Sequence, residues 1–210
     1  VSTLGTGTIN VNSTTLSMSS GSSMSGATGP ITFRCDTILM DPGVTLTELF
    51  SVRIAPRTSG REIDLGGPDS MTALGLTDAE LDTIAAPALK IGVENSGAIT
   101  VSADITRLSS TAMNLVSADD VVISGGQINT GGGTLLLDPG TSPFAVKPTK
   151  SGTDVTASTL SFGSDLALAI NGTTVDTQYD QLNVVGGVDL TGGPEQAVAV
   201  WRMPDHRPFR

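Results

Sequence analysis

Two adjacent carboxylates, Asp119 and Asp120, come closest to a catalytic pattern among the residues of this sequence. A carboxyl pair can hydrolyse a glycosidic bond when one group acts as general acid and the other activates water. Few other residues could support such chemistry, because His206 is the single histidine and Cys35 the single cysteine. This count argues against a Ser-His-Asp triad and against a zinc site built on His or Cys. We interpret the acidic pair as a solvated turn and predict no catalytic residue, with catalysis by the pair as the alternative.

Calcium and phosphate ligands are the next chemistry that the sequence could offer. The calcium-binding pattern Gly-Gly-x-Gly-x-Asp does not occur, and Gly186-Gly187-Val188-Asp189 is only a partial likeness. We expect most Asp residues to cap turns through bonds from side chain to backbone. The stretches 125–126 and 131–133 are glycine-rich but lack the Gly-Lys-Ser or Gly-Lys-Thr of a phosphate loop, so we expect tight corners there. No cofactor and no metal are predicted.

The composition restricts the partners and the core. The 210 residues carry 11 basic and 21 acidic side chains, and the net charge of -10 argues against a nucleic-acid partner. No apolar run approaches the roughly 18 to 20 residues that a membrane helix needs, so we expect no membrane insertion within this segment. Only 3% of the residues are aromatic, so Val, Ile, Leu, Ala and Met must build the core. Such small side chains favour closely stacked strands.

Three local features bear on processing. The lone Cys35 has no partner for an intramolecular disulfide, and we expect it to be a small buried hydrophobe. Residues Val1 to Asn10 lack the regions of a signal peptide and an initiator Met, so we expect an excised or processed piece with any export signal outside it. The sequons at Asn12 and Asn171 are glycan acceptors only if the producing cell glycosylates.

Short alternating or β-branched runs, each closed by Gly, Asn, Asp, Ser or Pro, follow one another along nearly the whole chain. This pattern predicts short strands separated by turns. The predicted strands are Thr8 to Val11, Thr15 to Met18, Ile31 to Met40, Val44 to Ile54, Glu62 to Leu65, Leu89 to Val93, Ala98 to Ile105, Met113 to Val116, Val121 to Ile123, Thr134 to Leu137, Thr159 to Phe162, Leu166 to Ile170, Gln181 to Val185 and Val188 to Leu190.

One stretch, residues 77–85, predicts a helix. Thr77 is a suitable N-cap, and Glu80 stands three residues later at the spacing of a capping box. Leu81 and Ile84 share one face, and a following proline ends the pattern. We expect this short helix to cover an edge or a rung of the core.

Turn signals about 8 to 12 residues apart fit a β-sandwich or a β-solenoid. Irregular turn lengths, few aromatics and many Asn, Ser and Thr residues favour the solenoid, since a sandwich usually buries a Trp or Tyr. We predict an all-β solenoid of about eight to ten coils, forming a rod about 40 to 50 Å long, with the sandwich as the alternative.

Two internal echoes are interpreted as degenerate repeats. Leu39-Met40-Asp41-Pro42-Gly43 recurs as Leu136-Leu137-Asp138-Pro139-Gly140. Val101-Ser102-Ala103-Asp104-Ile105 recurs as Val116-Ser117-Ala118-Asp119-Asp120-Val121. Each echo ends a strand with an acidic or Asp-Pro-Gly turn.

Several segments carry a family resemblance, and together they cover most of the chain. Very large bacterial surface proteins of the filamentous haemagglutinin and autotransporter-like adhesin type have segments similar to Ile63 to Gly67, Leu74 to Leu81, Leu89 to Gly92 and Ser96 to Val101. The Tyr-Asp-Gln-Leu repeat of bacterial exported β-strand-repeat proteins resembles Leu168 to Thr173, Tyr179 to Val184 and Val188 to Gly193.

This resemblance implies a right-handed parallel β-helix that is exported to the cell surface or medium and used for adhesion or as a stalk. The family carries no catalytic residues that could be transferred to this sequence. The partners that it implies are surface glycans or proteins of host or neighbouring cells, and neighbouring repeats of a parent chain. We therefore predict a non-catalytic adhesin shaft or surface-display scaffold with an extracellular or cell-surface location.

The rival prediction is a β-helical polysaccharide-degrading enzyme of the pectinase type. Asp119-Asp120 before Val121-Val122-Ile123 resembles the paired-Asp motif of polygalacturonases. The other motifs of that family are missing: Gly131 follows Asn129-Thr130 where the family has Asp, and neither Gly-His-Gly nor Arg-Ile-Lys occurs. The enzymatic alternative therefore rests on Asp119 and Asp120 alone.

The last ten residues differ from the rest of the sequence. Trp201, His206 and three of the eleven basic residues all lie within 201–210. We predict one β-helical domain over residues 1–200, a fragment of a longer repeat protein, and an anomalous tail over 201–210 that is not part of the fold.

Overall fold

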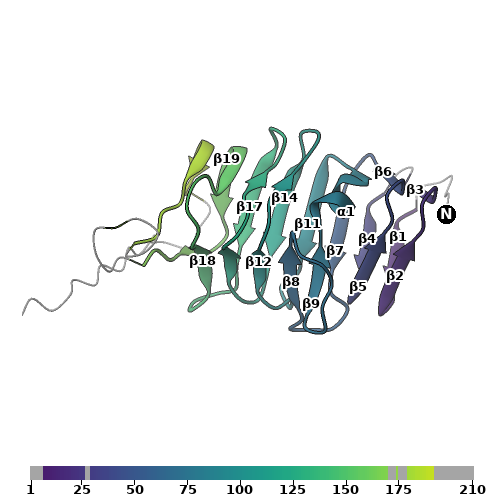
Figure 1. Ribbon diagram of the computed structural model, residues 1–210, viewed down its shortest axis with the longest axis horizontal. Coiled ribbons are helices and arrows are strands. Elements are labelled where there is room, and N and C mark those ends of the chain that lie inside the picture. The colour runs from purple at the N-terminus through teal and green to yellow at the C-terminus, as the bar shows by residue number, and fades with distance from the viewer. Residues whose placement is uncertain (1–6, 27–28, 170–173, 175–178, 192–210) are drawn as a thin grey trace, which may run out of the picture.

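Short strands wind around one long axis in the structure, a computed structural model that describes residues 7–26, 29–169, 174 and 179–191 (Figure 1). All the strand pairs in this part of the chain are parallel. They stack as a β-solenoid of about seven turns. The predicted parallel β-helix is confirmed, and the alternative is wrong, since a sandwich is built from antiparallel sheets.

Each coil contributes strands to three faces, which we call the first, second and third face. The first face stacks β1 (Ile9–Asn12), β4 (Ile31–Arg34), β7 (Val52–Ala55), β11 (Ala88–Gly92), β14 (Ala112–Val116), β17 (Thr134–Asp138), the second half of β19 (Val155–Phe162) and the second half of β21 (Val184–Asp189). The second face stacks β2 (Thr15–Met18), β5 (Thr37–Met40), β9 (Ala73–Leu76), β8 (Glu62–Leu65), β12 (Ile99–Val101), β15 (Val121–Ile123), β18 (Ala145–Pro148) and β20 (Asp165–Leu166). The third face holds β3 (Ser23–Gly26), β6 (Thr45–Glu48) and β10 (Ile84–Ala85), followed by β13 (Ile105–Thr106), β16 (Ile128–Asn129) and the first halves of β19 and β21.

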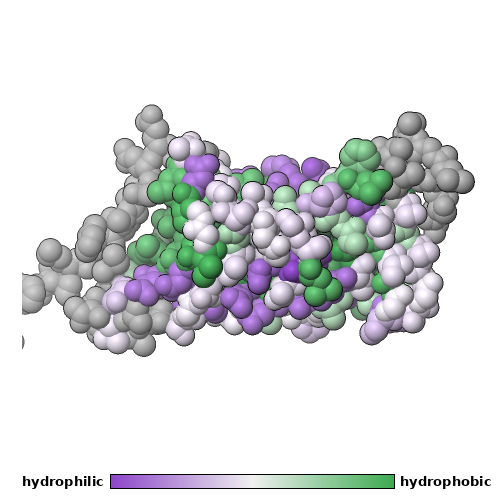
Figure 2. Space-filling view, turned by 90° about the horizontal axis from the view of Figure 1, so that it is seen from above, coloured by the Kyte–Doolittle hydropathy of each residue, from purple (hydrophilic) through white to green (hydrophobic). Residues whose placement is uncertain are grey.

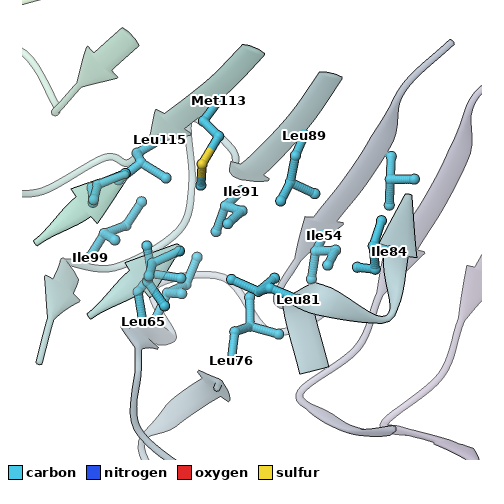
Figure 3. Close-up of a cluster of buried hydrophobic side chains, with 14 of the residues drawn as sticks. Ile54, Leu65, Leu76, Leu81, Ile84, Leu89, Ile91, Ile99, Met113 and Leu115 are labelled. Carbon is cyan, nitrogen blue, oxygen red and sulfur yellow. The ribbon is translucent and has the colours of Figure 1, made fainter. Parts of the chain in front are cut away.

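Aliphatic side chains stack on one another inside the solenoid. On the first face Val52 pairs with Leu89, and Leu89 pairs with Met113 on the next coil. Because side chains alternate across a strand, every second residue of each strand faces this interior. In Figure 3 the side chains of Leu89, Met113 and Leu115 from the first face point into the same interior as those of Ile99 and Leu65 from the second face. Burying each such side chain is worth about 1.5 to 3 kcal/mol, which makes this narrow core the main source of stability.

One coil carries an inserted rung that the other coils lack. On the first face Val52 pairs with Ile31 on one side and directly with Leu89 on the other. The second face holds two strands at this level, because β9 lies between β5 and β8 while β8 pairs with β12. On the third face β10 and β13 do not pair, and helix α1 (Asp78–Asp82) lies between them. Figure 1 places β8, β9 and α1 in this one stretch of the rod.

The loop from β8 to β9, residues 66–72, folds back over the outside of β9. Gly75 allows this packing, because a Cβ there would lie 2.0 Å from the carbonyl carbon of Pro68. Asp69 fastens the loop: its Oδ1 accepts the Gly75 N–H at 2.9 Å, and its Oδ2 accepts the Ile38 N–H of β5 at 3.0 Å. Arg61 adds bonds to the carbonyl oxygens of Ser70, Met71 and Ala73, and to that of Asp36 on the preceding coil.

Helix α1 begins with the predicted capping box. The Thr77 Oγ1 accepts the Glu80 N–H at 3.3 Å, and Glu80 Oε2 accepts the Thr77 N–H at 3.0 Å. The helix ends earlier than predicted, since Ile84 already belongs to strand β10. Arg107, which is buried, donates to the carbonyl oxygens of Leu81 and Ile84. These bonds satisfy carbonyls that the end of a helix leaves free, and they join α1 to the next coil.

Other element predictions differ from the structure where coils turn corners. The predicted strands 31–40, 44–54 and 98–105 are each two strands on different faces, separated by a corner. Strands β3, β9, β16 and β18 are short and were not predicted, and β10 falls in the predicted helix. The eight to ten coils expected for the whole chain exceed the seven or so turns of the described part, in part because one coil contains the inserted rung.

The two internal echoes are not repeats of the coil. Leu39-Met40 belongs to the second face and Leu136-Leu137 to the first, so their Asp-Pro-Gly turns make different corners. Val101 and Val116 also end strands on different faces. The echoes therefore reflect turn chemistry at corners of different kinds.

Replacing Gly75 by Ala should destabilise the fold. The new Cβ would meet the Pro68 backbone, so the loop over β9 must move, at a cost of about 1 to 3 kcal/mol. Chemical denaturation measures the change in the free energy of unfolding. Gly7→Ala is the matched control, because no atom lies within 4 Å of a Cβ there. Equal stabilities for the two variants would contradict the packing of the loop on β9.

Candidate functional site

The predicted acidic pair lies in the corner between β14 and β15, where both carboxylates serve the local fold. Asp120 Oδ1 accepts the Ala145 N–H at 2.9 Å, and Oδ2 forms an ion pair with the Lys147 ammonium of β18. Asp119 Oδ1 accepts the Asp120 N–H at 2.7 Å, and the Asp119 N–H is donated to Ser117 Oγ. These contacts match the interpretation of the pair as a turn that fastens one coil to the next.

Other residues singled out in the sequence also have structural contacts. Asp189 accepts the N–H and the hydroxyl of Thr191, and these bonds lower the pKa of its exposed carboxyl. Asn12 is exposed, and its Oδ1 accepts a bond from Arg57 Nε at 3.1 Å. Cys35 is buried as expected, and this burial raises the pKa of its thiol. Gly125 forms a tight corner, since a Cβ there would lie 2.1 Å from the Ser102 carbonyl oxygen.

Some predictions fall outside the described residues. His206, Trp201, the whole 201–210 tail and the sequon residue Asn171 belong to this group. Within the ranges that are described, no group of three or more His, Cys, Asp or Glu side chains could hold a metal ion. The same ranges contain no helix of the length and apolarity required to cross a membrane.

One carboxylate with several contacts, Asp36, was not singled out from the sequence. Asp36, which is 8% exposed, accepts the N–H groups of Arg57 and Thr58 at 3.0 and 2.8 Å, and the Thr58 hydroxyl at 2.7 Å. Burial on its own raises the pKa of Asp36, but the bonds from Thr58, the charge of Arg61 and the Arg57 N–H outweigh it and lower the pKa. The partners are some twenty residues away, so no local motif could have identified them.

A groove of about 410 Å³ lies on the outer surface of the first face. Two rows of outward-facing residues line the groove, and each row takes one residue from β4, β7, β11 and β14 or from the turn before that strand. The row of short side chains, the short row, consists of Pro30, Ser51, Ala88 and Ala112. The polar row consists of Thr32, Arg53, Lys90 and Asn114, and Leu89 also contacts the groove. The short row leaves space above the sheet.

Two cations lie side by side in this groove. Arg53 and Lys90 are direct partners on adjacent strands, which run about 4.8 Å apart. Lys90 Nζ lies 3.4 Å from Glu94 Oε1, whose side chain is 79% exposed. The pKa of Glu94 is lowered mainly by a hydrogen bond from the backbone N–H of Glu94 itself, then by Lys90 and to a smaller extent by Arg53. Within the described residues the Arg53 guanidinium donates no hydrogen bond and forms no ion pair.

A second hollow of about 270 Å³ lies beside the groove, over the corner that follows β14 and β17. Its charged lining residues are Glu94 and Asp138. Burial raises the pKa of Asp138, with the charge of Lys90 acting in the opposite direction and that of Glu94 adding to the rise. The positive groove therefore lies next to an acidic hollow, which is found at the C-terminal ends of the strands of the first face.

Figure 2 shows one side of the rod as a mixture of hydrophilic and neutral surface, with hydrophobic side chains confined to separate patches.

Comparison with protein-family models, with curated proteins and with solved structures found no match to this chain. The resemblance to filamentous haemagglutinin-like proteins thus stays a hypothesis based on the sequence segments.

Asp120→Ala should destabilise the protein more than Asp119→Ala. Removing the Asp120 carboxylate leaves the Ala145 N–H and the Lys147 ammonium without their partner, at a cost of about 1 to 2 kcal/mol. Lys147 is 40% exposed, so solvent screens part of this loss. Thermal and chemical denaturation of both variants would measure the difference. A larger loss for Asp119→Ala would be inconsistent with the contacts of the corner.

Asp36→Asn should weaken the fold by about 1 to 3 kcal/mol at neutral pH and flatten its acid dependence. The folded pKa of Asp36 lies below the ordinary value of 3.8, so the folded chain binds fewer protons there than the unfolded chain. Its contribution is complete above pH 3.8 and is lost as the pH falls through the folded pKa.

The measurement is the free energy of unfolding from pH 7 down to pH 2 for wild type and variant. The difference between the two should shrink in this acid range. Asp41→Asn is the control, because Asp41 is exposed in a turn and its carboxyl contacts none of the described residues. A difference that stays constant with pH would refute the role of the ionised Asp36.

Proposed function

We propose that this chain is a non-catalytic segment of an exported bacterial surface protein, acting as an adhesin shaft or surface-display scaffold. The observation that carries the proposal is the solenoid itself: parallel coils stack in register over a continuous apolar core along the described part of the chain. Each coil supports its neighbours through backbone bonds and aliphatic stacking. An elongated rod of this kind can hold whatever is attached to its two ends apart from each other.

The contacts of the acidic residues support the non-catalytic side of this proposal. A glycosidase needs two carboxyl groups that flank one bond, with one of them free to protonate the leaving group. Asp120 is instead paired with Lys147, and Asp119 bonds to its own corner. Polysaccharide degradation by this pair remains the alternative function, and no other contact favours it.

The proposed partners follow from the same function. Coils that follow or precede this segment in a longer chain would continue its ladders, since the end strands of a solenoid otherwise present unpaired backbone groups. Surface glycans or proteins of host or neighbouring cells are the proposed adhesion partners, and the proposed location is extracellular or at the cell surface.

A bacterial display experiment tests the proposal. The chain is placed between a surface anchor and an epitope tag, and antibody binding to intact cells is measured. We expect the epitope to be exposed and the segment to resist protease on the cells. Leu65→Asp is the matched control, because a charge at this fully buried position should unfold the coil and remove protease resistance.

A failure of export with wild type, in a host that exports the tag and anchor alone, would contradict the proposal. So would release of reducing sugar from acidic polysaccharides by wild type that is lost in Asp119→Ala with Asp120→Ala. The enzymatic alternative predicts this second outcome.

A further inference from the structure

We propose that the groove on the first face binds an acidic polysaccharide, with Arg53 and Lys90 contacting its anionic groups. The groove is built from the two rows defined above, and its volume of about 410 Å³ falls within the range of about 300 to 1,000 Å³ typical of ligand sites. This inference does not depend on the chain being a shaft, since a free-standing solenoid would carry the same surface.

The charges in the groove are not explained by the stability of the fold. Like charges directly opposite each other on adjacent strands are destabilising, and Arg53 and Lys90 are such a pair. Arg34 lies diagonally across from Arg53 on the same outer surface and adds a third positive charge. The exposed Glu94 forms an ion pair with Lys90 and is also close enough to Arg53 to feel its charge, but among the described residues Arg53 itself forms no ion pair. An anion placed between the two cations would reduce their repulsion, and it could accept hydrogen bonds from two N–H groups of the Arg53 guanidinium.

The shape of the groove favours an extended ligand. Four strands of the first face contribute to its lining, and three spacings between paired strands amount to about 14 Å. The long direction follows the axis of the solenoid, across the strands. Neutral polar groups of Thr32 and Asn114 flank the two cations in the polar row, so donors and acceptors for hydroxyl groups lie on both sides of the charge.

Other anionic polymers fit these observations less well. A peptide that adds a strand needs the open edge of a sheet, and the groove lies on a sheet face whose strands are already paired on both sides. The lining contains no aromatic residue on which nucleic-acid bases could stack. A sugar chain that carries acid groups needs neither feature.

The test measures binding of four labelled polymers to the full chain: alginate, which carries carboxylates, dextran sulfate, neutral dextran and polyglutamate. We expect alginate to bind, with an affinity that falls as salt is raised to about 0.15 M. Arg53→Gln with Lys90→Gln should weaken binding by at least about tenfold. Ala88→Gln should weaken it similarly, because it fills the groove without changing the charge.

Controls separate this site from general electrostatics and from misfolding. Lys150→Gln removes one positive charge far from the groove and should leave the affinity within about twofold of wild type. The melting temperature of the Arg53 and Lys90 double variant should equal or exceed that of wild type, since a like-charge pair is removed.

Tighter binding of dextran sulfate than of alginate would support the site and assign sulfate as the preferred anion. The proposal is overturned if neither acidic glycan binds, if neutral dextran or polyglutamate binds as tightly, or if the double variant keeps wild-type affinity. None of these outcomes bears on whether the chain is exported, so the two proposals fail independently.

Discussion

Parallel backbone pairing from coil to coil is the constraint on which this structure depends. Inside each sheet a strand bonds to one strand below and one above, so an apolar residue at an inward position must have apolar partners at the same position on both neighbours. The series Ile31, Val52, Leu89 and Met113 meets that requirement on the first face. The scarcity of aromatic residues follows, because an interior this narrow is filled by aliphatic side chains.

The inserted rung disturbs this pairing on two faces, and partly or fully buried polar side chains compensate for it. Where β5 meets β9, the N–H groups of Ile38 and Met40 are accepted by the carboxylates of Asp69 and Glu80. Where β10 and β13 fail to pair, the Arg107 guanidinium takes up the carbonyls of Leu81 and Ile84. A buried backbone group without a partner costs free energy comparable to a lost hydrogen bond, so these side chains act as parts of the ladder. The carboxylates of Asp69 and Glu80 therefore have a structural role.

The same insertion links the fold to the surface on which binding is proposed. The first face receives no extra layer, which brings β7 directly against β11 and sets Arg53 opposite Lys90. Short residues beside them leave a hollow on the outer surface of the sheet. The local irregularity of this repeating fold is therefore what places the two cations side by side.

The sequence by itself determined most of the short strands and the capping box at Thr77 and Glu80, because these depend on local periodicity and on residues a few positions apart. It favoured a solenoid over a sandwich, and the family resemblance implied that the strands pair in parallel. It also identified the Asp119 and Asp120 corner as a turn. Only the tertiary structure decided that β9 lies beside β5, that Asp36 bonds to Thr58, and that Arg53 meets Lys90. These contacts join residues that are far apart in the chain, and they arise from the winding of the coils, which no local pattern encodes.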